Sequence, residues 1–256
     1  MQTASKEKVI KVLVASHKDY PMPDDPIYVP IQVGAAGKES IKGFIRDDSG
    51  DNISGKNDRY CELTGLYYGW KNLECDYLGL MQYRRRFTLS GEEALSIFKE
   101  ADIIVPKKRR YFIESLYSHY ANTLEKGHLD IAKQVVSEKY PSYIPYLDDV
   151  YSRTWGYMFN MFIMDKERMD RYCEWLFTIL EECERRIDIS TLSAFDKRLF
   201  GRVSEVIFNA WVLKEWDEGA VIREVPVMST EKVNWLKKGS AFLMAKFFHK
   251  KYDKSF

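Results

Sequence analysis

The sequence predicts an α/β fold, in which a sheet of buried strands carries helices on its faces. Short apolar runs rich in β-branched residues alternate with longer segments whose apolar residues recur at helical spacing. Polar loops containing Gly and Pro separate the two kinds of segment. The 256 residues are 45% hydrophobic and 30% charged, which is ordinary for a globular protein long enough to bury a core without disulfides.

Six apolar runs predict the strands. The first, "KVIKVLVASH" (8–17), is broken by the polar, Pro-containing "KDYPMPDD". The second, "YVPIQVGAAG", ends in small residues, and the third, "CDYLGLMQY", leads into three consecutive arginines. The later strands are expected in "DIIVPKK" (102–108), "MFNMFIM" (158–164) and "AVIREVPV" (220–227). A strand that enters a core and then meets three like charges raises the question of which anion neutralises them.

Helices are predicted between these strands and through the middle of the chain. Leu63, Leu66, Tyr67 and Trp70 recur at helical spacing and predict the first helix. The remaining helices are expected at 91–101, at 111–141 with a break near Gly127 after which Asp130 opens the next helix, at 165–188 and at 196–215. We find no internal repeat or linker, so residues 1–232 are interpreted as one domain followed by a tail, 233–256.

Composition limits the function classes. The net charge is +1, so no bulk field drives binding to nucleic acid or membrane. The four cysteines form no CxxC pair, which favours free thiols in a reducing compartment. No signal-peptide core is seen, and no stretch approaches the roughly 18 apolar residues of a spanning helix. We therefore expect a cytoplasmic protein.

The tail mixes large apolar residues with lysines, in "VNWLKKGSAFLMAKFFHKKYDKSF". Such a segment can lie on an anionic lipid leaflet, or it can be a helix packed on the domain or a frayed end. The membrane interpretation predicts salt-sensitive binding to anionic vesicles. Equal vesicle binding after deletion of the chain from Val233 onward would remove it.

Several segments resemble a known family. They are "GDNISGKNDRYCELTGLYYGWKN", "YLGLMQYRRRF", "IIVPKKRRYFIESLYSHYANTLEKGHLDIAKQVVSEKYP" and "NMFIMDKERMDRYCEWLFTIL". In this order, from about Lys11 to Trp216, the chain resembles a bacterial family of capsule and O-antigen gene clusters, long catalogued as a domain of unknown function, number 4422. The usual third strand of the family is "GLCHYRRYF". Here Gln82 replaces the His and Arg86 the second aromatic residue, whereas Tyr83, Arg84 and Arg85 are retained.

The resemblance implies a GT-A-like, Rossmann-related mixed sheet flanked by helices, and a glycosyltransferase that builds surface polysaccharide. It implies a nucleotide-diphosphate sugar donor, with UDP expected, a hexose such as galactose or galactofuranose, and a lipid-linked glycan acceptor. A binding module that has kept the pocket and lost the chemistry is the alternative, for which Gln82 is the support. A nucleic-acid-binding role for "KKRR" (107–110) is disfavoured by the near-zero net charge.

Such a transferase must hold a diphosphate and stabilise it as it leaves. Many GT-A enzymes do so with a divalent metal on an Asp-x-Asp motif, and this sequence contains none. Arg84 to Arg86 are therefore candidates to replace the metal at the diphosphate, because the guanidinium fork matches phosphate oxygens. A regular strand would send Arg84 and Arg86 to one side and Arg85 to the other, so at most two of them could serve one ligand. Tyr83, Arg84 and Arg85 are the candidate substrate-binding residues of this segment. The plain alternative is that these arginines form a solvated strand end or pair with nearby acids such as Glu74 and Asp76. No resident cofactor is expected, and manganese or magnesium arriving with the nucleotide is left open.

Other candidates come from positions beside the predicted strands and from the family match. Ser16 and His17 follow the first strand, where α/β sheets bind ligands; the alternative for them is an ordinary exit loop. Asn57 precedes the helix before the arginine strand, and its alternative role is to cap that helix. Candidate bases for an acceptor hydroxyl are Asp130 and Glu205. Further candidate substrate-binding residues are His119, His128, Asn160 and Arg202, each of which has a purely structural interpretation as well.

Overall fold

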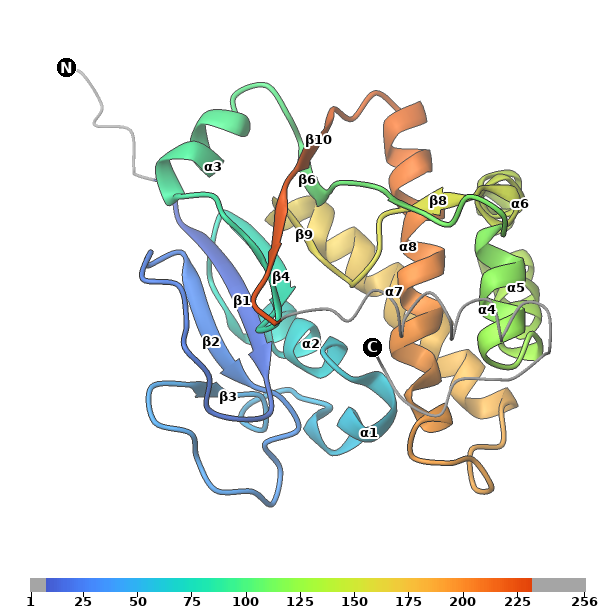
Figure 1. The fold of residues 1–256 in the computed structure, drawn as a ribbon, viewed down its shortest axis with the longest axis horizontal. Helices are drawn as coiled ribbons and strands as arrows, with labels where there is room; N and C mark the ends of the chain where they lie inside the picture. Colours follow the sequence, from blue (N-terminus) through green and yellow to red (C-terminus); the bar gives the residue numbers. More distant parts are fainter. Residues whose placement is uncertain (1–7, 232–256) are drawn as a thin grey trace.

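The computed structural model describes residues 8–231. A nine-stranded mixed sheet runs in the order β10-β6-β9-β4-β1-β2-β3, and β5 extends from β4 to pair with β11 (Figure 1). Its strands are β1 (Ile10–Ser16), β2 (Tyr28–Gln32), β3 (Ile45–Arg46), β4 (Tyr77–Gln82), β5 (Arg85–Phe87), β6 (Ile103–Pro106), β9 (Phe162–Asp165), β10 (Ile222–Val225) and β11 (Val227–Ser229). A separate two-stranded ribbon pairs β7 (Arg109–Arg110) with β8 (Trp155–Gly156). The predicted α/β class is confirmed.

Strands β1, β2 and β4 are parallel, and β9 inserts antiparallel between β4 and β6. Both faces of the central sheet are buried, which explains why β1 is almost wholly apolar instead of alternating. Leu13 and Ala15 contribute to the larger core, whereas Val12 and Val14 contribute to the core on the opposite face. The period of two along a strand produces this division.

Helices cover the two faces unequally. The larger core is covered by α2 (Leu63–Asn72), α7 (Lys166–Arg186) and α8 (Leu199–Asp217), and the smaller one by α3 (Gly91–Ile97). Helices α4 (Leu116–Thr123), α5 (Gly127–Lys139) and α6 (Ile144–Ser152) gather beside α7 and α8 (Figure 1). Short turns complete the set: α1 (Asn57–Tyr60), η1 (Ser54–Lys56), η2 (Pro141–Tyr143) and η3 (Asp196–Arg198). The break near Gly127 is confirmed, although α5 begins at Gly127 itself, before Asp130.

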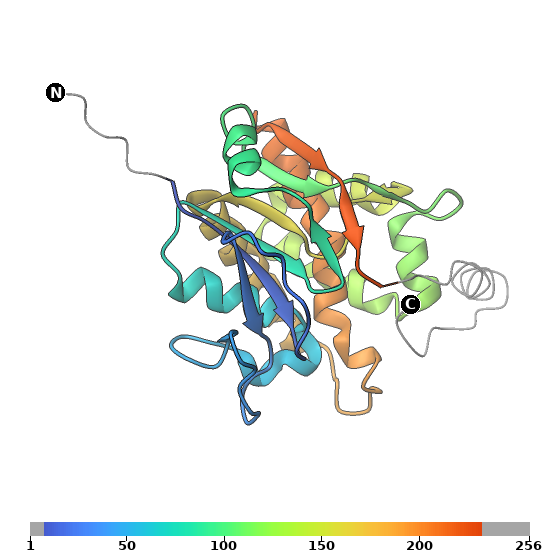
Figure 2. The same cartoon turned by 60° about the vertical axis from the view of Figure 1, so that its left-hand side comes forward.

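The arginine segment differs from its prediction. The strand does not continue through the arginines, because Tyr83 and Arg84 form a turn and Arg85 pairs antiparallel with Gln82. The alternation expected of a regular strand, with Arg84 and Arg86 on one side and Arg85 on the other, is therefore wrong. Figure 2 shows the resulting β5 beside β11. The single strand predicted at 220–227 covers β10 and only the first residue of β11. Pro226 separates those two strands, because proline lacks the backbone N–H that a continuous ladder needs.

The sheet brings distant segments to one edge. The carboxyl ends of β1 and β4 meet there, with the start of β9, because β9 is antiparallel to β4. The carboxyl end of β6 leads to Arg109 at the same edge. In open α/β sheets the crevice outside the carboxyl ends of strands is where ligands bind. The fold therefore predicts that the ligand site lies at this edge.

A buried carboxylate stabilises the loops beside that edge. Asp47 is fully buried and accepts hydrogen bonds from the Gly34 and Ala35 backbone N–H groups (2.8 and 2.9 Å). It also accepts bonds from the hydroxyls of Ser54 (2.5 Å) and Thr64 (2.6 Å). One side chain thus joins the exit of β2 to the start of α2.

Asp47→Asn should destabilise the protein. An amide offers one acceptor oxygen where the carboxylate offers two, so buried donors lose partners at a cost of about 1–3 kcal/mol. The midpoint of urea unfolding measures the effect. Asp148→Asn is the matched control, because Asp148 is 51% exposed in its pair with Lys133, and it should change the free energy of unfolding by less than about 0.5 kcal/mol. Equal effects of the two substitutions would contradict this account of Asp47.

Within residues 8–231 we find no helix with the length and hydrophobicity needed to cross a bilayer. The tail from Val233 onward, with its predicted membrane contact, lies outside the described residues. The boundary between residues 232 and 233 stays a prediction.

Candidate functional site

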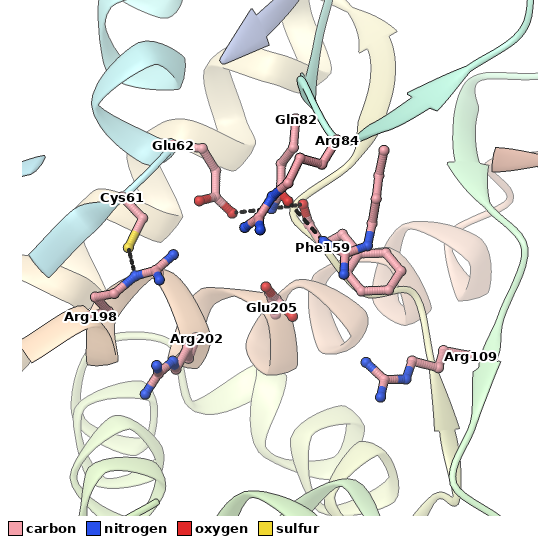
Figure 3. Close-up of a pocket in the computed structure, with 11 residues that line it drawn as sticks. Cys61, Glu62, Gln82, Arg84, Arg109, Phe159, Arg198, Arg202 and Glu205 are labelled. Atoms are coloured by element: carbon pink, nitrogen blue, oxygen red, sulfur yellow. Dashed lines mark hydrogen bonds between the residues drawn. The ribbon is translucent and has the colours of Figure 1, made fainter. Parts of the chain in front are cut away.

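A cavity of about 190 Å³ opens at the carboxyl edge of the sheet. Its walls come from the α1–α2 junction, the β4–β5 turn, the segments that flank β6 and β9, and the first turns of α8 (Figure 3). The lining residues are Cys61, Glu62, Gln82, Arg84, Arg85, Arg109, Phe159, Arg198, Gly201, Arg202 and Glu205. Five arginines and two glutamates line it, so with both carboxylates ionised its walls carry a formal charge of +3.

Three of these arginines have no carboxylate counter-ion among residues 8–231. Arg85, Arg109 and Arg202 make no ion pair within 4.0 Å there, and Nη1 of Arg202 is buried without a hydrogen-bond partner. Burial lowers the pKa of Arg85 and of Arg202, and neighbouring arginines lower each further. Clustered, partly desolvated cations of this kind favour an anionic ligand.

Aromatic rings orient the same arginines without consuming their N–H donors. Arg85 lies over Phe159, with 4.3 Å between its Cζ and the ring centroid, and Arg202 lies over Phe195 at 3.8 Å. Arg109 lies over Tyr111 at 4.8 Å. A stacked guanidinium is held in place while its edge stays available for bidentate bonding. The stacked arginines therefore favour the interpretation as phosphate ligands over the alternative of a solvated strand end.

The third arginine of the run does not join the cavity. Arg86 is 6% exposed and donates to the carbonyl of Tyr83 (3.0 Å) and to the carbonyl of Pro21. Arg84 remains at the cavity, where it forms a 3.7 Å ion pair with Glu231. The turn at Tyr83 and Arg84 explains how two consecutive arginines face one space.

Glu205 lies on α8, and Figure 3 shows its carboxylate pointing into the cavity. Burial, followed by the charge of Glu62, raises its pKa to about 7, against opposing effects of the Phe159 backbone, Arg109 and Arg85. A carboxylate with such a pKa can accept and release a proton near neutral pH. Of the two predicted bases, this one lies at the cavity.

A hydrogen-bond network fixes the second carboxylate. Oε1 of Glu62 accepts from Nε2 of Gln82 and from Nδ2 of Asn160, both at 2.9 Å. Gln82 also donates to the Phe159 carbonyl (3.2 Å) and accepts from Nη1 of Arg85 (3.2 Å). Asn160 donates its second N–H to the carbonyl of Gly201 (2.9 Å). The amide of Gln82 thus links Glu62 to the arginine turn.

The backbone around this network is strained. Cys61, Phe159 and Asn160 have positive φ values of 55°, 79° and 49°, a region that residues other than Gly and Asn rarely adopt, so the strain falls on Cys61 and Phe159. Such strain concentrates at functional sites, because the surrounding structure must maintain it. The left-handed pair at 159–160 also explains why β9 begins at Phe162 and not at 158 as predicted.

Residues predicted after the first strand lie beside the cavity but not in its lining. Ser16 is buried, and its hydroxyl donates to the Lys18 carbonyl (2.7 Å), which shapes the exit loop. His17 is exposed and meets Tyr83 edge to face at 5.6 Å. Partial desolvation of its ring lowers the pKa of His17, and the charges of Lys18 and Arg84 lower it further. Tyr83 is buried beneath His17.

Asn57 and Asn160 serve the framework of the site. Asn57 donates to the carbonyl of Cys61 (2.7 Å) and to Thr64 (3.1 Å), and so supports the strained turn that carries Glu62. Asn160 is 1% exposed and supports the same residue from the other side. Contact of either amide with substrate stays a prediction.

The mid-chain candidates lie away from the lining. Asp130 is exposed on α5 and accepts from the hydroxyl of Tyr117 (2.8 Å). His119 contacts Glu114 (2.8 Å), and the buried His128 contacts the Tyr120 hydroxyl (3.2 Å). The helical middle segment therefore presents none of the three to the cavity, and their predicted roles in catalysis or binding gain no support from its geometry.

Sequence reasoning missed seven lining residues as candidates: Cys61, Glu62, Gln82, Arg109, Phe159, Arg198 and Gly201. Glu62 was hidden in a segment that indicated a helix, and Arg109 in the basic run 107–110, which was considered only for nucleic-acid binding. The available signal was an acid beside a Cys in "RYCELTG", within the first segment that carries the family resemblance.

The structure shows no group of three or more His, Cys, Asp or Glu residues arranged to hold a metal within residues 8–231. The donor set of the cavity, mostly guanidinium, suits an anion and not a cation. The two lining carboxylates are the acidic groups there that a metal arriving with a nucleotide would meet.

Comparisons with known proteins agree with this description. The family model described as a domain of unknown function (DUF4422) matches residues 11–216. The solved apo structure of WbbM, a bifunctional glycosyltransferase, is 31% identical to the chain with a TM-score of 0.79. The match covers 88% of this chain and 46% of the WbbM chain, so this chain spans less than half of that protein. No curated protein matches. The chain belongs to the DUF4422 family and has a GT-A-like fold.

Proposed function

We propose that the protein is a glycosyltransferase that moves a hexose from a nucleotide-diphosphate sugar to a lipid-linked glycan. The observation that carries the proposal is the cavity, in which arginines without counter-ions stand beside a carboxylate whose pKa is about 7. The likeness to WbbM, a bifunctional glycosyltransferase, supports the reaction class. We further propose UDP as the nucleotide, galactose or galactofuranose as the hexose, and capsular, exopolysaccharide or O-antigen synthesis as the pathway.

In the proposed reaction, Arg84 and Arg85 bind the diphosphate from the β4–β5 turn, and Arg202 meets it from α8. The bond between the anomeric carbon and the β-phosphate oxygen breaks, and its electron pair leaves with the diphosphate. The arginines stabilise the charge that develops on this group. The acceptor oxygen bonds to the anomeric carbon, and its proton passes to the carboxylate of Glu205. Atoms and charge balance without any further reactant.

The guanidinium donors supply the positive charge that a metal supplies in other transferases, so we propose that the reaction needs no divalent metal. A lipid-linked acceptor, if used as proposed, would be met at the membrane, and the sequence carries a basic, apolar tail. We therefore propose that the enzyme acts at the inner face of the cytoplasmic membrane. His17, whose ring meets that of the buried Tyr83 beside the diphosphate positions, is the proposed contact for the nucleoside.

The experiment is a measurement of UDP release from UDP-glucose, UDP-galactose and UDP-galactofuranose, with an alkyl hexoside as a simple lipid-like acceptor. Acceptor-dependent release from one donor supports the transferase. Binding of a donor without hydrolysis or transfer would instead support the alternative, a non-catalytic module for sugar nucleotides or glycans. Gln82 at the usual His position would then mark the lost chemistry.

A further inference from the structure

The network around Glu62 assigns this residue a task distinct from that of Glu205. Its Oε1 is saturated by two amide N–H donors, and each donor's second N–H is fixed on a backbone carbonyl. A carboxylate has about four acceptor positions. No described residue donates to Oε2, and Glu62 lines the cavity (Figure 3). One oxygen is therefore anchored while the other remains available.

Hydrogen bonds and packing hold this arrangement in place. Glu62 follows the left-handed Cys61 at the start of α2, and Asn160 is itself left-handed and 1% exposed. The hydroxyl of Ser204 lies 2.9 Å from Oδ1 of Asn160 and fixes the orientation of that amide. The anchored carboxylate thus cannot swing toward the arginines without breaking two hydrogen bonds of 2.9 Å.

We infer that Oε2 of Glu62 is the hydrogen-bond acceptor for a hydroxyl of the transferred hexose, and that Glu62 selects for the sugar part of the donor. The inference rests on the proposed function and deepens it. A fixed, uncommitted acceptor beside an arginine cluster suits a ligand with hydroxyl donors at one end and an anionic group at the other. A nucleotide-diphosphate hexose has this composition, whereas free nucleoside diphosphate offers the second feature but lacks the hexose.

Glu62→Gln tests this assignment with little change of shape. The glutamine oxygen can accept from Gln82 and Asn160 as Oε1 does, and its NH₂ then replaces the acceptor Oε2 by a donor. Affinity for UDP should stay within about twofold. Affinity for the UDP-hexose that serves as donor should fall about tenfold or more, the value of one hydrogen bond to a charged group. Gln82→Met, which removes one of the two anchors, should show a smaller loss in the same direction.

Isothermal titration of the full chain with UDP, UDP-glucose, UDP-galactose and UDP-galactofuranose measures these affinities. Glu184→Gln is the matched control: Glu184 accepts bonds from Lys56, Arg59 and Tyr60 away from the cavity, and its loss should leave all affinities unchanged. Equal weakening of UDP and UDP-hexose by Glu62→Gln, or no weakening of either, would overturn the inference and leave the proposed function standing. No binding of any of the four by the unmodified protein would overturn both.

Discussion

Glu205→Gln is expected to lower kcat by a factor of about 10² to 10⁴ while the KM for the donor changes by less than about threefold. The amide keeps the size of the side chain and removes its ability to accept a proton. The activity of the unmodified enzyme should rise with pH through about 7, because the carboxylate must be ionised to act as base. The residual activity of the variant should lack this rise. Steady-state rates between pH 5.5 and 9 measure both effects.

The stability of the same variant gives an independent readout. Because burial raises the pKa of Glu205 above its ordinary 4.5 to about 7, its contribution to stability is fully present below pH 4.5 and is lost as the pH rises through 7. This rise in the pKa corresponds to at most about 3 to 4 kcal/mol. At pH 8 the variant should therefore unfold at a higher urea concentration than the unmodified protein, although it is less active.

The control is Glu167→Gln, since Glu167 is 87% exposed on α7, and it should change neither kcat nor the pH profile. A Glu205→Gln enzyme with full activity and an unchanged pH profile would exclude Glu205 as the base. The other predicted base, Asp130, would then deserve the same substitution.

The second large effect is expected from the double variant Arg84→Ala, Arg85→Ala. Each arginine offers charge-assisted hydrogen bonds worth about 1.5–3 kcal/mol to a phosphate, so UDP affinity should fall by roughly 100-fold or more. The fold should survive, because Arg85 has no ion pair within 4.0 Å among the described residues and burial already lowers its pKa. Isothermal titration, with near-ultraviolet circular dichroism as a check on packing, measures the outcome.

Arg110→Ala is the control for the double variant, because Arg110 is exposed on β7 and does not line the cavity. Arg86 is unsuitable for this purpose, since its buried guanidinium holds the carbonyls of Tyr83 and Pro21. If the double variant Arg84→Ala, Arg85→Ala keeps an affinity for UDP within about threefold of that of the unmodified protein, the arginine turn does not bind the diphosphate.

The sequence was sufficient to predict the central sheet, because β1, β4 and β6 are buried on both faces and read as continuous apolar runs. It also placed Arg84, Arg85, Arg202 and Glu205 among the candidates, and all four line the cavity. Local patterns suffice where a strand is wholly buried or where charge interrupts an apolar run.

The rest depended on long-range packing. The turn at Tyr83 and Arg84 carries no Gly, Asn or Pro, so no local signal marked it. Arg109 and Arg198 reach the cavity from segments 89 residues apart in the sequence, through the pairing of β6 with β9 and the docking of α8. The left-handed pair Phe159–Asn160 interrupts a run that looks uniformly like a strand. Apolar periodicity cannot reveal a backbone that tertiary contacts impose.

The central claim is that guanidinium groups, without a metal, hold the donor diphosphate in this cavity. Isothermal titration of the unmodified protein with UDP, in EDTA and then with manganese, beside the Arg84→Ala, Arg85→Ala variant, tests it most directly. We predict equal affinity under both conditions for the unmodified protein and loss of binding under both for the variant. Binding that requires manganese and is unchanged in the variant would contradict the claim and place the diphosphate on an acidic metal site elsewhere.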